Sequence, residues 1–233
     1  MIRTILFFPV LMLFTLSAFA QAFVIGDVNT LSDHLTYKNS DNNNPGIDSY
    51  YANIDGSPYL DNEFSTGEVT MNDSLQFKNI PLRYNVLNDK MQFLDERNQI
   101  FEIDNPEQNY RYILGEHRFL SCDYSIEGEI QHGIIEELVK GKIKLYKKYS
   151  AKFKPATKAI GFQEAEPDRI LRDDEIYLFA IGNAVPENIR FNKKTLFNSL
   201  EPFKKDIEQY AKKENLKLRS EEDLIRLIRY CNE

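Results

Sequence analysis

The sequence predicts an α+β fold in which an antiparallel β-meander, forming a roll, a sandwich or a barrel-like sheet, precedes a C-terminal module of three short helices. From about residue 67, short segments rich in β-branched and aromatic residues recur at intervals of roughly 8–12 residues, as in antiparallel β proteins. From Asn192 the apolar residues repeat instead with the helical period of about 3.6. The expected connections are shorter than the dozen or so residues of a parallel crossover, so consecutive strands are expected to pair.

Polar turn residues separate the expected strands. Gly141 lies in the turn between Val139 and Lys142, where a positive φ suits a residue without Cβ. Gly182 ends another strand, and the polar residues 95–98 form a longer loop. The expected strands cover residues 67–72, 75–79, 82–87, 90–94, 99–103, 110–114, 117–124, 132–139, 142–150 and 175–181, with a further piece near 184–190.

Three helices are expected at the C-terminus. Leu196 and Leu200 mark the first, and Pro202 suits the first position of the second because a helix start needs no N–H there. Ser220, followed three residues later by Asp223, resembles a capping box and predicts the start of the third helix. The apolar face expected for the second helix consists of Phe203, Ile207, Tyr210 and Ala211.

The first twenty residues have the features of a secretory signal peptide. Arg3 supplies the positive start, residues 5–16 form an apolar run, and small residues lead to a cleavage site after Ala20. The run is shorter than the roughly 20 residues of a membrane-spanning helix, so no integral membrane segment is expected after cleavage. We therefore expect a periplasmic or extracellular protein. The expected organisation is a signal peptide at 1–20, a low-order segment and polar linker at 21–55, a β-rich domain at 56–190 and a helical module at 191–233.

Charge is distributed unevenly along the chain. Residues 21–139 contain 21 acidic and 7 basic residues, whereas residues 140–160 contain eight lysines and no acid. In an extended strand, lysines that alternate with apolar residues form a row on one face, which could contact an anionic envelope component or another envelope protein. The contact residues expected in this lysine-rich segment are Lys142, Lys144, Tyr146, Lys148, Tyr149, Lys152 and Lys154.

Other interpretations of the lysine-rich segment remain open. Its lysines would also suit a solvated strand face, an edge strand protected against aggregation, or neutralisation of acids elsewhere in the same chain. Nucleic acid is not an expected partner, because the chain is acidic, with a net charge of −7, and would be repelled outside this segment.

The two cysteines, Cys122 and Cys231, could form a disulfide in an oxidising compartment. Two buried free thiols are the favoured interpretation. Cys231 follows Leu224, Leu227 and Ile228 at helical spacing, so it belongs to an apolar stripe that faces the core in either case.

No motif for catalysis, cofactor binding or metal binding occurs in the sequence. The serine-hydrolase elbow, the zinc-protease helix motif, the phosphate loop and the paired CxxC are all missing, and His34, His117 and His132 are widely spaced. Two alternatives stay open. One is a hydrolase using two carboxylates, for example within 136–137, 164–166 or 173–175. The other is a β-barrel that carries an apolar ligand.

Four segments resemble a family of uncharacterised exported proteins of Gram-negative bacterial envelopes. They are GSPYLDNEFSTGEV (56–69), NIPLRYNVLNDKMQF (79–93), KIKLYKKYSAKFKP (142–155) and EEDLIRLIRYCNE (221–233). The resemblance spans about residues 56–233. It implies export, assigns no activity or catalytic residue, and often places Tyr where this chain has Cys231. We therefore expect an exported, non-enzymatic envelope or binding protein.

Overall fold

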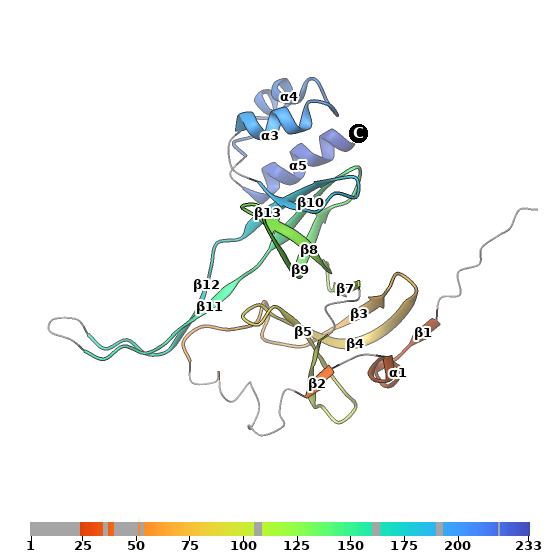
Figure 1. Cartoon of the computed structure of the whole chain (residues 1–233), viewed down its shortest axis with the longest axis vertical. Coiled ribbons are helices and arrows are strands. Elements are labelled where there is room, and N and C mark those ends of the chain that lie inside the picture. Colours follow the sequence, from red (N-terminus) through yellow and green to blue (C-terminus); the bar gives the residue numbers. More distant parts are fainter. Residues whose placement is uncertain are drawn as a thin grey trace, which may run out of the picture.

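The computed structural model describes residues 24–34, 37–39, 51, 54–104, 109–159, 164–189, 193–218 and 220–233. Within these residues the chain has an α+β fold, with a barrel-like antiparallel sheet and three helices at the C-terminal end, as the sequence predicts (Figure 1). The expected signal peptide and the cleavage site after Ala20 lie outside the described residues.

The first half of the sheet is built from neighbouring antiparallel strands. The spatial order is β7-β3-β4-β5-β6, so β3 lies between β4 and β7 although it precedes both in the chain. Alternating burial along these strands turns one face toward the core. The strands are β3 (Ser65–Met71), β4 (Leu75–Asn85), β5 (Lys90–Leu94), β6 (Ile100–Ile103) and β7 (Tyr110–Leu114).

The second half of the sheet closes into a ring of five strands. Neighbouring strands pair in the order β8-β9-β10-β13-β14, and β14 returns to β8 through a parallel pairing of Glu187 with Ser125. Because β8 also pairs with β7, it belongs to both halves of the sheet. The strands are β8 (His117–Ile126), β9 (Glu129–Val139), β10 (Ile143–Lys148), β13 (Ile176–Ile181) and β14 (Glu187–Asn188).

The N-terminal segment is more ordered than the sequence indicates. The prediction of a low-order linker over 21–55 is wrong for three elements: β1 (Val24–Gly26), α1 (Val28–His34) and β2 (Tyr37–Asn39). β1 pairs in parallel with β4, β2 pairs with β6, and Leu31 of α1 is fully buried. Elements this short show no clear period in the sequence, and the two strands pair with strands distant in the chain.

Two strand predictions are corrected. Residues 75–79 and 82–87 were expected as separate strands, but they form the single strand β4, in which Asn79 is the extra residue of a β-bulge with φ of 58°. Residues 142–150 were expected as one strand, but β10 ends at Lys148.

Beyond β10 the chain leaves the body as a long hairpin. β11 (Ala151–Lys154) pairs with β12 (Arg169–Arg172), and β12 leads into β13, the antiparallel neighbour of β10. The hairpin formed by β11, β12 and their connection, called the hairpin arm below, is therefore an extension of the β10–β13 pair. Figure 1 shows it projecting away from the rest of the molecule.

The C-terminal helices cover the outside of the ring. They are α3 (Lys193–Leu200), α4 (Ile207–Lys213) and α5 (Glu221–Asn232), and they lie beside β10 and β13 in Figure 1. The side chain of Ser220 accepts a hydrogen bond from the Asp223 N–H, which confirms the predicted helix start. Pro202 does not begin the second helix, because α4 starts at Ile207. No helix among the described residues is long and apolar enough to cross a membrane.

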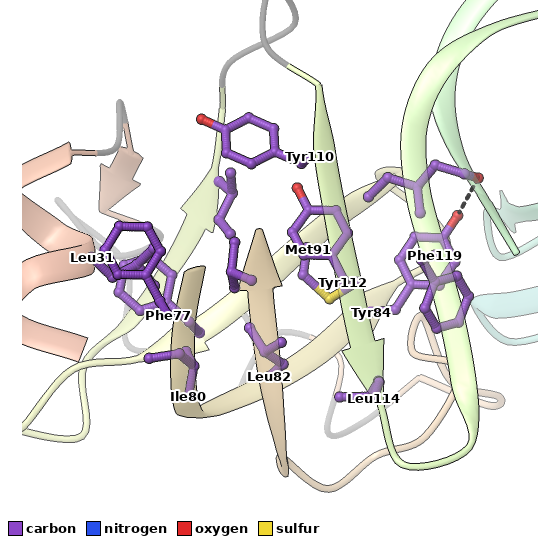
Figure 2. Close-up of a cluster of buried hydrophobic side chains, with 14 of the residues drawn as sticks. Leu31, Phe77, Ile80, Leu82, Tyr84, Met91, Tyr110, Tyr112, Leu114 and Phe119 are labelled. Atoms are coloured by element: carbon purple, nitrogen blue, oxygen red, sulfur yellow. Dashed lines mark hydrogen bonds between the residues drawn. The ribbon is translucent and has the colours of Figure 1, made fainter. Parts of the chain in front are cut away.

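Separate apolar clusters hold these parts together. One fills the first half of the sheet, where Tyr84, Met91 and Phe119 pack together in Figure 2. Another joins the outer face of the ring to the helices, and includes Ile143 and Leu224. A third cluster comes from four strands of the ring and fills its interior: Tyr124, Ile135, Tyr146, Leu178 and Ala180.

Candidate functional site

The lysine-rich segment does not form a solvent-facing row. β10 is covered on both faces, because Leu145 packs under the C-terminal helices while Tyr146 points into the ring. Lys148 and Tyr149 are buried as well. The expectation that these side chains contact an anionic surface is therefore wrong for Tyr146, Lys148 and Tyr149. A strand in the middle of a sheet, with neighbours on both sides and packing on both faces, exposes little of any side chain.

Lys147 joins the ring to the helical module. Its ammonium lies 3.4 Å from Glu136 of β9 and 2.7 Å from Glu221 at the start of α5. The Tyr149 hydroxyl donates to Glu136 at 2.6 Å, and the His117 ring lies 2.5 Å from the same carboxylate. Burial alone would lower the pKa of Lys147, but hydrogen bonding to Glu221 and Tyr149 and the Glu136 charge raise it. The carboxylates thus keep this lysine charged inside the fold.

Lys148 faces the other way and joins the ring to the first half of the sheet. Its ammonium lies 2.5 Å from Asp89, in the β4–β5 turn, and donates to the Ile134 carbonyl at 3.0 Å. Asp89 also accepts from the Tyr84 hydroxyl at 2.6 Å. Burial lowers the pKa of Lys148, against the opposing effect of Asp89. A Cβ at Gly133 would lie 2.1 Å from the Asp89 carboxylate, so a side chain at this position would displace that carboxylate.

The remaining lysines are more exposed, but several face acidic or aromatic groups. Lys142 lies over the Phe203 ring at 4.8 Å, and Lys144 is half-buried. Lys152 pairs with Asp173 at 2.6 Å, and Lys154 pairs with Glu166. The acids lie on the returning side of the hairpin arm, so the lysines of β11 are neutralised within the chain.

The hairpin arm presents apolar side chains to solvent. Phe153 is 39% exposed and Leu171 is 37% exposed. In the described part of the chain, β11 pairs with β12 alone, which leaves the other edge of β11 open. β12 is held at its base by Asp55, whose carbonyl accepts from the Ile170 N–H at 2.8 Å. Gly56, with φ of 95°, allows this contact because a Cβ there would lie 2.1 Å from the Ile170 carbonyl oxygen.

Both cysteines are free thiols. Cys122 packs against the cluster inside the ring, whereas Cys231 belongs to the cluster under the helices. Burial raises the pKa of Cys122 to about 12 and that of Cys231 to about 11, so both thiols stay protonated and unreactive near neutral pH.

Four of the acids considered for a carboxylate hydrolase are paired with lysines. They are held in separate ion pairs: Glu136 with Lys147, Glu137 with Lys140, Glu166 with Lys154 and Asp173 with Lys152. The interior of the ring is filled by its own side chains, which opposes the apolar-carrier alternative. No group of three or more metal-binding side chains comes together among the described residues.

Sequence reasoning missed one polar cluster. His132 contacts two β8 side chains, Ser121 and Asp123, whose roles no sequence motif indicates. A hairpin register that places residue 123 opposite residue 132 would have found them.

No protein-family model, curated protein or solved structure matches the chain. The resemblance to exported envelope proteins therefore stays a prediction from the quoted segments.

Proposed function

We propose that this is an exported binding protein whose recognition element is the hairpin arm, and that its partner is another envelope protein. The observation that carries the proposal is the arm itself: a two-stranded hairpin that leaves the body and exposes Phe153 and Leu171. Export is supported by the charge, the apolar run and the small residues before Ala20.

The open edge of β11 favours a partner that supplies an extended segment. An isolated two-stranded sheet is only marginally stable in water, and an unpaired edge accepts further strands. Adding a strand along β11 would satisfy its free backbone groups, and a pocket for Phe153 would provide specificity. This mode of binding uses main-chain hydrogen bonds and apolar contact, both of which the hairpin arm offers.

The charge balance favours a protein partner over an anionic surface. Residues 151–173 contain five basic and four acidic residues, with a net charge of +1. Lys152 and Lys154 are already paired with Asp173 and Glu166 of the same chain. Attraction to an anionic membrane grows by about 1 kcal/mol for each unpaired basic residue near the surface, so a nearly neutral arm gains little there.

Site-specific photo-cross-linking in the cells that produce the protein tests the proposal. A photoreactive phenylalanine analogue replaces Phe153 in one variant and Leu171 in another. Val185 and Ile130, which are 42% and 70% exposed on the body, are replaced in matched control variants. We expect a discrete adduct with a second protein from both arm positions and none from the controls.

Three results would contradict the proposal. The first is an equal adduct pattern from arm and control positions, which would indicate random collision. The second is binding of the purified protein to vesicles containing anionic phospholipid that survives Phe153→Ser with Leu171→Ser but is lost on Lys142→Ser with Lys144→Ser. The third is an adduct formed only with a second copy of this chain, which would exclude a separate partner.

A further inference from the structure

Ser121, His132 and Asp123 form a hydrogen-bonded chain on the β8–β9 hairpin. The Ser121 Oγ lies 2.9 Å from Nε2 of His132, and Nδ1 of the same ring lies 2.8 Å from a carboxylate oxygen of Asp123. Ser121 and Asp123 are two residues apart on one strand, so they share a face, and His132 is the cross-strand partner of Asp123. Because an ionised carboxylate only accepts hydrogen bonds, Nδ1 carries the proton and Nε2 accepts from the serine.

The serine and the histidine line a groove between the β4–β5 turn and the β8–β9 hairpin. The groove has a volume of about 230 Å³, and Tyr110 and Tyr112 form part of its wall. Asn88 of the β4–β5 turn and Lys90 at the start of β5 line it as well. The buried Asp89–Lys148 ion pair fixes that turn against β9, so both sides of the groove are anchored to the body.

We propose that this groove carries a nucleophilic serine for acyl transfer, with short-chain esters as the substrate class. An activated serine requires a base within hydrogen-bonding reach and a third group that orients the base, and Ser121, His132 and Asp123 meet both distance requirements. The groove is smaller than the roughly 300–1,000 Å³ of sites for drug-sized ligands, so the acyl group it accepts is short.

The reaction follows from the positions of the three side chains. The Ser121 Oγ attacks the ester carbonyl carbon while His132 Nε2 takes the hydroxyl proton. The bond from the carbonyl carbon to the leaving alkoxide then breaks, and His132 returns the proton to release an alcohol. Water attacks the acyl-serine, His132 accepts its proton and passes it to Oγ, and a carboxylic acid leaves. Asp123 stabilises the imidazolium in both halves of the reaction.

The negative charge that develops on the carbonyl oxygen requires hydrogen-bond donors. Asn88 and Lys90 line the groove, and the side chains of both carry N–H groups. Lys90 pairs with Asp104 at 2.7 Å, which leaves Asn88 as the neutral donor. The Asp123 side chain is 62% exposed, so solvent weakens its hydrogen bond to His132. Its contribution to the rate is therefore smaller than that of a buried triad acid.

Covalent labelling distinguishes this site from nonspecific hydrolysis. An exposed histidine alone can cleave an activated ester, so the decisive probe is a fluorophosphonate, which bonds to an activated serine oxygen and loses fluoride. We expect one label per chain, located at Ser121 by peptide mass spectrometry. His132→Gln should slow labelling and p-nitrophenyl acetate hydrolysis at least about 100-fold, and Asp123→Asn about tenfold.

Ser125→Ala is the matched control, because Ser125 lies on the same face of β8 but outside the hydrogen-bonded chain. It should keep the wild-type labelling rate, and far-UV circular dichroism should show that each variant is folded. Absence of label at Ser121, or undiminished hydrolysis by Ser121→Ala, would overturn the proposal. The arm variants test the binding function separately, since Phe153→Ser leaves all three side chains of this site in place.

Discussion

Asp89→Asn should destabilise the protein strongly, because it leaves the Lys148 ammonium without its charge partner. The Lys148 side chain is only 7% exposed and lies 2.5 Å from Asp89. Removing one partner of a buried ion pair costs about 3–5 kcal/mol. Because the Asp89 side chain is 29% exposed, and the Ile134 carbonyl still accepts from Lys148, we expect the lower end, about 3 kcal/mol.

Urea unfolding followed by far-UV circular dichroism measures this loss, since the chain has no tryptophan for fluorescence. Asp73→Asn is the matched control: its pair with Arg111 is exposed, so it should cost at most about 1 kcal/mol. Asp89→Asn with Lys148→Met should recover much of the loss by removing the buried charge. A loss for Asp89→Asn no larger than that of the control would refute this account of the ion pair.

The same variant has a defined pH dependence. Burial lowers the pKa of Lys148 in the folded protein, so between that pKa and the unfolded value of about 10.4 the unfolded chain binds more protons and stability rises with pH. Asp89 raises the pKa of Lys148, so removing Asp89 lowers that pKa further. The pH range over which stability rises therefore begins at a lower pH in Asp89→Asn. The deficit of Asp89→Asn relative to wild type should therefore shrink as the pH rises toward 10. A constant deficit over this range would contradict the mechanism.

Two further predictions concern the helical module and the thiols. Ser220→Ala should lower the free energy of unfolding by about 1 kcal/mol, because the Asp223 N–H loses its hydrogen-bond acceptor. Ser220→Thr should keep most of the stability. Equal urea midpoints for the two variants would contradict the capping role of Ser220. Cys122 and Cys231 should resist a thiol reagent at pH 8 in the folded, unreduced protein, because burial raises the pKa of both thiols. Both should react once the protein is unfolded in urea. Fewer than two reactive thiols in urea would reveal a disulfide.

Much of the fold could be predicted from the sequence, because hydrophobic alternation and turn residues are local signals. The strand ending at Val139 and the helix capped by Ser220 both lie where these signals place them, whereas the connection around Gly141 is longer than the expected tight turn, because Val139 pairs with Leu145. Asn79 broke the expected pattern because a bulge hides the continuity of β4. Local signals also miss β1, which forms only when β4 is available as a partner.

The candidate sites were harder to predict because they depend on register and burial. The alternation of apolar and charged residues correctly separates the two faces of β10 around Lys148. It does not reveal that neighbouring elements cover both of these faces. Ser121 and His132 became partners only because β8 and β9 extend to a two-residue turn at 127–128, which sets Asp123 opposite His132. Shorter expected strands, ending at 124 and restarting at 132, left that register undefined.

The position of the hairpin arm has a consequence for how this protein can vary. The arm is inserted between β10 and β13, which pair with each other from Ile143 and Ile181 to Lys148 and Ile176. Adding or removing residues in matched pairs at its far end would keep every side chain of the ring on its present face. Lengthening a flexible connection costs little conformational entropy, about 0.6 kcal/mol for each doubling of its length. The length of the arm can therefore change while the barrel-like body stays the same.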